Sequence, residues 1–446
     1  MPMAPRANRI WLVVWILAAV VLVARATSRR EAKGVILDHV EFGRRLWLGE
    51  DVYGPWRSDV DAPLAPLHPP YPPSFGLMTM PCALVAEVAG MRAARAMWAL
   101  VQIGCLVWIA RVLRDLLTGR AEHAPPAAND GRAANWHLIW LLGALLLLRF
   151  LLRDMHGGGG NVINLALCLA AFADAERGKP LRAGLLLGFS LATKPTQLWL
   201  LPMFAVFGRW RALGWTAATG FGCVLVTLAL QRFDVAPWLR WIEGTWALAT
   251  QSDAFADPAL GFPKFEWMNQ SLRCALARWL GEVPPEFAAK VAWGVPRGLG
   301  FVQATVAMVT RIVSVSLLAL TLVVGWRARR STMGRMWAFA GALVLSVLLS
   351  PLSWKAHHMA LAPVVVLLVH RALQRRERWI WALFAGWVLC CQLGADLVGD
   401  AADEWGNSVY VVTAWDLALL VLAARLAHSA SLAARTPGTA IPDRLH

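Results

Sequence analysis

Apolar residues along this chain gather into long segments that are separated by short charged runs. The segments span about residues 10–26, 73–90, 92–113, 136–152, 161–175, 183–207, 212–230, 299–326, 336–350, 358–370, 379–397 and 407–425. Inside a bilayer each must be helical, because unpaired backbone groups are too costly in hydrocarbon. The pattern predicts an all-α polytopic membrane protein, a bundle of about 10–12 membrane helices.

The polar stretches define the rest of the organisation. Two are long, at 27–72 and 231–298, and we expect both to be loops of a single integral membrane domain over residues 1–426. The first apolar segment resembles a signal peptide ending near Ala26, but Arg25 falls inside that site and favours an uncleaved helix. We expect residues 427–446 to form a disordered cytoplasmic tail.

Composition excludes a soluble globular protein. Only 16% of the residues are charged and 58% are hydrophobic, whereas soluble domains carry about 25% charged residues. A net charge of +15 would suggest nucleic acid in a soluble protein. Here the basic residues lie in short runs between apolar segments, so we expect a membrane-lipid partner and no nucleic acid.

These basic runs predict the topology. They occur at 111–132, 177–182, 209–211, 327–335 and 371–378, and all can be cytoplasmic if segments 73–90 and 183–207 make no net crossing. Pro81 interrupts the first segment and Lys194-Pro195 the second. Loops 27–72, 153–160, 231–298, 351–357 and 398–406 would then all face outward.

The first outward loop holds the most informative carboxylate. Asp38 begins a stretch in which Val40, Phe42, Leu46 and Trp47 give an amphipathic helical pattern. At the lipid–water boundary, partial desolvation would raise the pKa of Asp38 toward that of a useful general base. The alternative is a solvated Asp that caps the helix.

Cations near the same side form a second group of candidates. Arg149, Arg153 and His156 precede four glycines at 157–160, whose N–H groups at a helix start suit an anion. Lys194 lies within an apolar segment, where a charge usually marks a site, unless its long side chain reaches the interface.

Polar residues in the later loops complete the set. Asn269 starts an Asn-Gln-Ser run, and Trp354 closes a Ser-Pro-Leu-Ser-Trp run that is followed by His357 and His358. Adjacent helical residues point about 100° apart, so we expect only one of the two histidines to face a site. A three-residue pattern at Asp59 and Asp61 is too short to predict a metal, and we expect neither a metal nor another cofactor.

Taken in order, these motifs resemble glycosyltransferase family 87, the polyprenyl-phosphate-mannose-dependent mannosyltransferases of the GT-C superfamily. The resemblance covers residues 10–425. It rests on the following residues: Asp38, Phe42, Gly49, Tyr53, Tyr71-Pro72-Pro73, Asn161, Asn164, Ala183-Gly184-Leu185, Lys194-Pro195, Asn269-Gln270-Ser271, Ser350-Pro351-Leu352-Ser353-Trp354 and His357-His358.

The resemblance implies an extracytoplasmic active site with Asp38 as general base and a histidine, His357 or His358, beside the Trp354 motif. We expect Lys194, Arg149, Arg153 and His156 to bind a donor phosphate. We expect Asn161, Asn269 and Trp354 to bind sugar or acceptor.

The predicted function is hexose transfer with inversion, with mannose favoured, from a polyprenyl-phosphate donor to a glycolipid, glycan or protein on the outer side of the plasma (inner) membrane. The alternative is a transporter or flippase of a lipid-linked sugar. Transporters often carry internal repeats, whereas this sequence has none that we detect, and its unusual polar residues gather on one predicted side.

Overall fold

The computed structural model describes residues 5–28, 35–54, 71–119, 135–256 and 265–434, and in these ranges it is built from helices with one isolated β-bridge between Gly281 and Phe301. In the first half the helices are α1 (Pro5–Thr27), α2 (Ile36–Leu48), α3 (Phe75–Leu117), α4 (Trp136–Leu146), α5 (Leu148–Gly157), α6 (Asn161–Glu176), α7 (Pro180–Thr193), η1 (Pro195–Gln197), α8 (Leu200–Val206), α9 (Trp210–Leu230) and α10 (Ala236–Thr250).

The second half continues in the same way. It comprises α11 (Leu272–Leu280), α12 (Pro285–Ala288), α13 (Gln303–Ala328), α14 (Thr332–Leu349), η3 (Lys355–Leu361), α15 (Ala362–Arg375), α16 (Arg378–Trp387), the π-helical η4 (Val388–Gln392), α17 (Ala395–Val398), α18 (Asp400–Ser408) and α19 (Val411–Ala433). Helix α19 runs past residue 426, where the disordered tail was expected to begin.

Membrane-spanning helices dominate the described chain, which confirms the all-α polytopic fold. Seven helices are long and apolar enough to cross a bilayer, or eight if α5 and α6, bent by 113°, form one broken span. Others of the expected 10–12 are shorter, because apolar segments are divided: 136–152 becomes α4 and α5, and 183–207 becomes α7, η1 and α8.

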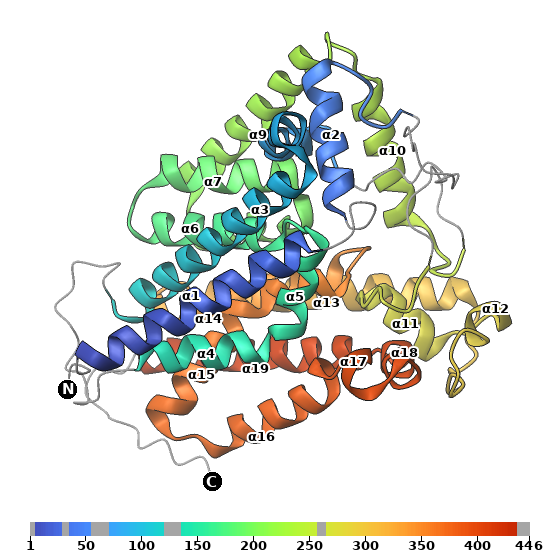
Figure 1. Cartoon of the computed structure of the whole chain (residues 1–446). Helices are drawn as coiled ribbons and strands as arrows, with labels where there is room; N and C mark the ends of the chain where they lie inside the picture. Colours follow the sequence, from blue (N-terminus) through green and yellow to red (C-terminus); the bar gives the residue numbers. More distant parts are fainter. Residues whose placement is uncertain (1–4, 29–34, 55–70, 120–134, 257–264, 435–446) are drawn as a thin grey trace.

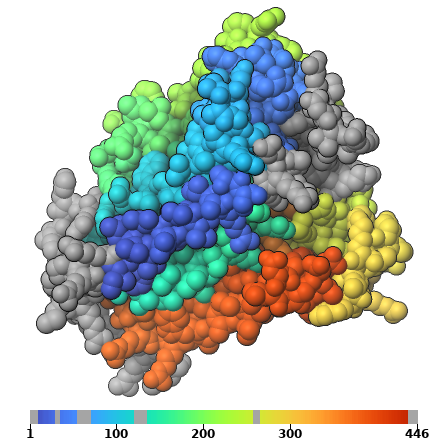
Figure 2. All heavy atoms as spheres, in the orientation of Figure 1, coloured from blue at the N-terminus to red at the C-terminus, as the bar shows by residue number. Residues whose placement is uncertain are grey.

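Some helices lie inside this bundle, and others line its surface. Of the most apolar window of α14, 78% is buried, whereas α1 and α13 bury only 6% and 11%. In Figure 2, α1 lies across the surface between α3 and the α4–α5 pair. A helix that exposes apolar side chains in this way is one that faces lipid.

The two ends of the bundle differ in their polar contacts. Arg209 and Arg335 both pair with the buried Glu176, at 2.8 Å and 2.5 Å, and Arg177 pairs with Asp115 at 3.2 Å. Four of the five basic runs therefore meet at one end. In Figure 1 the long helices α1, α14 and α19 run rightward from the left, and α10, α11, α12 and α18 lie at their right end.

The interruption expected in segment 73–90 lies elsewhere. Helix α3 continues through Pro81, and the chain departs from helical geometry at Gly90, with φ 83° and ψ 166°. Glycine adopts positive φ without steric cost, while neighbouring helices in a bundle compensate for the hydrogen bond that a proline removes. The interruption near Lys194-Pro195 is confirmed, because α7 ends at Thr193.

Candidate active site

Helix α2 presents Asp38 in its first turn. The apolar residues Ile36, Val40, Phe42 and Leu46 of this helix are buried, as the amphipathic pattern predicts, whereas Trp47 is 51% exposed. Val35, and not Asp38, occupies the N-cap position of α2, where the described residues form no side-chain capping hydrogen bond. The carboxylate is accessible but surrounded by protein on most sides, and desolvation by this burial raises the pKa of Asp38 from 3.8 to about 6.

The turn between α5 and α6 packs directly against the start of α2. Gly158 has a φ of +76°, and a Cβ at this position would lie 2.5 Å from the Cβ of Ile36. The next carbonyl, that of Gly159, accepts a hydrogen bond from Trp98 Nε1 at 3.1 Å. Glycine is needed here because both the conformation and the close approach exclude a side chain. This contact joins the α5–α6 turn to the first turn of α2, the helical turn that also carries Asp38.

Within the same turn, Asp154 caps helix α6. Its buried carboxylate accepts hydrogen bonds from the backbone N–H groups of Asn161 (3.3 Å) and Val162 (3.0 Å) and from Asn161 Nδ2 (2.7 Å). A Cβ on Gly159 would lie 2.0 Å from Asp154 Oδ1. The glycine run therefore makes room for an internal carboxylate, which takes the N–H groups that the sequence offered to an external anion.

Lys194 lies in the break between α7 and η1, outside the candidate spans. Asn164 stabilises this break in the helix: its Nδ2 donates to the Lys194 carbonyl (3.2 Å) and to Thr196 Oγ1 (3.0 Å). The Lys194 side chain is only 2% exposed, and among the described residues its ammonium makes no ion pair or hydrogen bond. Burial lowers the pKa of Lys194 to about 8, against the opposing attraction of Asp154.

Tyr71 lies close to the charges of Asp38, Asp154 and Lys194. Its ring stacks on Phe75 at 4.0 Å between centroids and lies 5.4 Å from Lys194 Nζ. Burial raises the pKa of Tyr71, and the carboxylates of Asp38 and Asp154 add to that effect. An open carboxylate, a buried cation and a neutral phenol therefore share one small region.

His39, on the buried side of α2, packs against this region. Its ring is fully buried and meets Tyr71, Phe75 and Trp98 edge-on, at 5.8, 4.8 and 5.5 Å between centroids. Burial, and then the charge of Lys194, lower the pKa of His39 to about 3. The ring is therefore neutral at physiological pH and acts as packing for Tyr71.

The two adjacent histidines have different surroundings. His358 is fully buried, with Nε2 2.9 Å from Asp416 Oδ2 and Nδ1 3.2 Å from the Trp354 carbonyl. His357 is partly exposed, and its Nδ1 accepts the Trp354 backbone N–H at 2.9 Å. A nitrogen that accepts a hydrogen bond carries no proton, so in its neutral form the His357 ring has its proton on Nε2. Of the pair, only His357 has a nitrogen left for a substrate.

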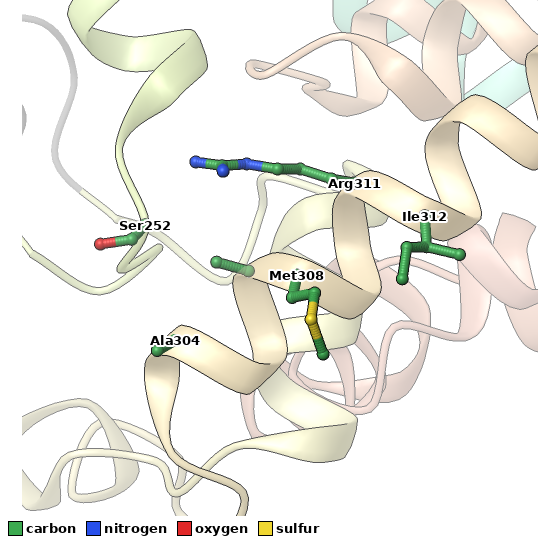
Figure 3. A pocket seen from close by; sticks show the side chains of 6 residues that line it. Ser252, Ala304, Met308, Arg311 and Ile312 are labelled. Atoms are coloured by element: carbon green, nitrogen blue, oxygen red, sulfur yellow. The ribbon is translucent and has the colours of Figure 1, made fainter.

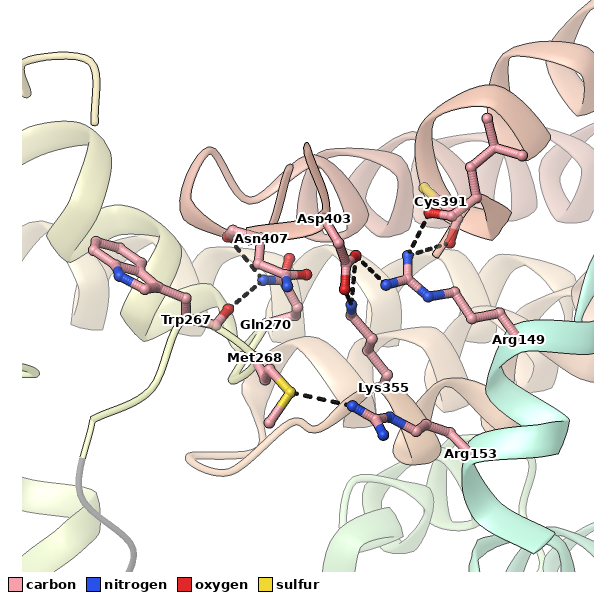
Figure 4. Close-up of polar contacts among 10 residues, drawn as sticks. Arg149, Arg153, Trp267, Met268, Gln270, Lys355, Cys391, Asp403 and Asn407 are labelled. Atoms are coloured by element: carbon pink, nitrogen blue, oxygen red, sulfur yellow. Dashed lines mark hydrogen bonds and ion pairs between the residues drawn. The ribbon is translucent and has the colours of Figure 1, made fainter. Parts of the chain in front are cut away.

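Arg149 belongs to a partly buried ion cluster (Figure 4). Its guanidinium donates to the carbonyls of Cys391 and Leu393, both at 3.1 Å, and pairs with Asp403. Lys355 Nζ contacts both carboxylate oxygens of Asp403, at 3.1 and 3.3 Å. Burial alone would raise the pKa of Asp403, but Lys355 and Arg149 outweigh it and hold that pKa below its usual value.

The other predicted phosphate ligands are more open. Arg153 is exposed and points from α5 toward Met268, whose sulfur accepts at 3.4 Å (Figure 4). His156 lies partly buried in the last turn of α5. Arg153 therefore keeps donors free for an anion, whereas the guanidinium of Arg149 is committed to protein acceptors.

Asn269 joins two loops. Its Nδ2 donates to the Pro351 carbonyl (3.0 Å), and its Oδ1 accepts from the backbone N–H groups of Ser353 (2.9 Å) and Ser271 (3.2 Å). The side chain thus fixes the loop that carries Trp354. We assign Asn269 a structural role rather than a sugar contact.

The sequence analysis did not identify several charged residues that form ion pairs at or near the site. Asp416 lies in an apolar segment, and an intramembrane carboxylate is itself a signal of a site or a pair. Lys355 lies between Trp354 and His357 in the sequence, and no local pattern singled out Asp403. Asp59 and Asp61 lie outside the described residues, as do the other residues of 29–34 and 55–70 in loop 27–72.

Comparisons with known proteins identify a family and a relative of this chain. The sequence profile of glycosyltransferase family 87 matches residues 70–351. The chain is also 25% identical over 382 residues to a Mycolicibacterium smegmatis protein named polyprenol-phosphate-mannose-dependent alpha-(1-2)-phosphatidylinositol mannoside mannosyltransferase, covering 83% of this chain and 77% of that one. Tyr71, Asp154 and Lys194 fall within the profile match.

Proposed function

This chain belongs to glycosyltransferase family 87, and we propose that it transfers mannose from a polyprenyl-phosphate donor to an extracytoplasmic acceptor with inversion at the anomeric carbon. The name of the mycobacterial relative supports a polyprenyl-phosphate-mannose donor. The single observation that carries the proposal is the pairing of an accessible carboxylate, Asp38, with a buried and unpaired cation, Lys194, around Tyr71.

The donor phosphate would bind at Lys194. A buried ammonium that makes no direct ion pair is costly. The Asp154 carboxylate attracts Lys194 from a distance, and a phosphodiester anion in direct contact would neutralise it. The Nε2–H group of His357 would add a neutral donor, and the exposed Arg153 would add a second cation. Fixed donors of this kind stabilise charge that develops on a leaving group, and each is worth about 3–4 kcal/mol in well-ordered sites.

Asp38 would act from the other side of the sugar. Its carboxylate takes the proton of an acceptor hydroxyl, and the hydroxyl oxygen forms a bond to the anomeric carbon. The bond from that carbon to the phosphate oxygen breaks, and its electron pair leaves with polyprenyl phosphate. Attack opposite the leaving group inverts the configuration.

Sidedness follows from the two ends of the bundle. The basic runs that meet around Glu176 are typical of a cytoplasmic face, so Asp38 would lie on the outer face of the plasma membrane. The acceptor would be a glycolipid, a glycan or a protein exposed there.

The test is transfer of labelled mannose from synthetic polyprenyl-phosphate-mannose to a membrane glycolipid extract, with the purified chain in proteoliposomes. The matched glucosyl donor serves as the control for sugar identity, and NMR of the product reports its anomeric configuration. We expect a mannosylated product of inverted configuration. Equal or preferred use of the glucosyl donor would contradict the sugar assignment, and retention would contradict the one-step displacement.

A pair of variants tests the orientation of the two histidines. We expect His357→Ala to lower the transfer rate while leaving thermal stability close to that of the wild type. His358→Ala leaves the buried Asp416 without its partner, so we expect a large loss of thermal stability. The reverse pattern would show that His358 faces the substrate.

A further inference from the structure

A small hollow lies on the membrane-facing surface, away from Asp38 and Lys194. It has a volume of about 310 Å³ between the chain that follows α10 and the first turns of α13 (Figure 3). Its lining consists of Ser252, Ala304, Ala307, Met308, Arg311 and Ile312. All but two of these side chains are apolar, and Arg311 supplies the only charge of the lining.

Arg311 is unusual for its position. It lies in a span with a mean hydropathy of 2.2, eight residues after the helix begins at Gln303, or about 12 Å along the axis. Among the described residues no carboxylate pairs with it. Asp253 is next to the lining residue Ser252, but its Oδ1 accepts the Phe255 backbone N–H at 2.8 Å. A charge at this depth requires a partner.

The depth matches that of lipid phosphates. A helix of 26 residues is about 39 Å long, close to the full thickness of a bilayer including headgroups. Arg311 therefore starts within the hydrocarbon, and its long side chain reaches the headgroup boundary. In Figure 3 the guanidinium extends away from α13 toward the chain that carries Ser252.

An apolar track for acyl chains starts at the hollow. Met308, Ile312 and Val315 are 56%, 58% and 66% exposed and follow one another at helical spacing on one face of α13. A lipid whose phosphate contacts Arg311 would lay its chains along this face. The hollow thus combines an anion contact with a hydrocarbon surface in the order that a phospholipid requires.

The charge of the lining selects the headgroup. One guanidinium matches one phosphodiester charge, and it can bind two phosphate oxygens together. The lining has no carboxylate to receive the ammonium of a zwitterionic headgroup, whereas the Ser252 hydroxyl can bond a headgroup hydroxyl. We propose that this hollow is a binding site for an anionic glycerophospholipid of net charge −1, of the phosphatidylglycerol type.

Such a lipid would fix the outer chain against the bundle near the catalytic loop. Ser252 is four residues beyond Leu248, which packs against Leu352 of the loop that leads to His357. The lipid would bridge this chain to α13. It is separate from the donor and acceptor, so the proposal does not depend on the transfer reaction.

The test is native mass spectrometry of the full chain, titrated in detergent with phosphatidylglycerol or phosphatidylethanolamine. We expect the wild type to bind phosphatidylglycerol at least about tenfold more tightly than phosphatidylethanolamine. Arg311→Gln should remove about tenfold or more of that affinity, the loss of one charge-assisted bond. Arg25→Gln, in the exposed span α1, is the matched control and should retain wild-type affinity.

A second variant keeps the site testable if Arg311→Gln folds poorly. Ala307→Trp fills the hollow and keeps the charge, so it should also abolish the preference for phosphatidylglycerol. Equal affinity in wild type, Arg311→Gln and Ala307→Trp would overturn the proposal. Equal binding of both phospholipids would overturn the headgroup assignment. Arg311-dependent displacement by polyprenyl phosphate at lower concentration would reassign the site to the donor lipid.

Discussion

The pH dependence of transfer follows from two groups at the site. Asp38 must be ionised to accept a proton, and burial raises its pKa to about 6. Lys194 must be protonated to bind a phosphate, and burial lowers its pKa to about 8. The rate therefore rises with pH through about 6 and falls again through about 8. This predicts a bell-shaped profile with a maximum near pH 7.

The size of the effect follows from the same two values. Asp38 is ionised to about one-tenth at pH 5 and about nine-tenths at pH 7. Lys194 is charged to about nine-tenths at pH 7 and about one-tenth at pH 9. We therefore expect kcat/KM to be roughly tenfold lower at pH 5 and at pH 9 than at pH 7.

A substitution that keeps the charge separates the two limbs. Arginine stays protonated throughout this range, so Lys194→Arg should lose the alkaline limb even if its maximal rate is lower. Lys194→Met removes the cation and should lower kcat/KM by about 10²–10³-fold. Both are measured as initial rates of mannose transfer at low donor concentration, with enzyme returned from each pH to pH 7 as the stability control.

Two results would refute this reasoning. One is an alkaline limb near pH 8 that persists in Lys194→Arg, because the titrating group would then be another residue. The other is a rate that does not change between pH 5 and pH 7, because a base of pKa about 6 must titrate there.

Two further substitutions test the supports of the site. In Gly159→Ala the new methyl would lie 2.0 Å from Asp154 Oδ1, so we expect about 1–3 kcal/mol of destabilisation, seen as faster thermal inactivation in detergent. Asp403→Asn removes the carboxylate charge that the buried Lys355 shares with Arg149. We expect about 3 kcal/mol or more of lost stability, measured by the same assay.

Matched controls exist on the same chain. Gly214→Ala places a methyl in open space on a helix and should not destabilise. Asp396→Asn removes an exposed carboxylate on the neighbouring α17 and should have little effect. Equal losses in a variant and its control would contradict the packing or charge argument in question.

Local patterns predicted the elements that carry the site. Helix α2 and the interruption at Lys194-Pro195 came from the spacing of apolar residues and from proline, which act within a few residues. The start of α6 at Asn161 followed from the glycine run. Such features depend on neighbours in the sequence, so a single sequence is enough to find them.

Contacts between distant elements were beyond the sequence pattern. Nothing local shows that Asp416 is the partner of His358, or that Asp154 occupies the helix start that the glycines leave open. Arg149 was predicted to bind phosphate because the pattern could not place Asp403 beside it. The break at Gly90 was missed because proline is the stronger local signal, although tertiary packing tolerates Pro81.

Mannose transfer by Asp38→Asn tests the central claim most directly. Asparagine keeps the size of the side chain and removes the base, and Glu50→Gln, an exposed carboxylate just beyond α2, is the control. The account predicts that Asp38→Asn, correctly folded, loses at least about a hundredfold in rate while Glu50→Gln retains it. Transfer by Asp38→Asn at the wild-type rate would contradict Asp38 as the general base.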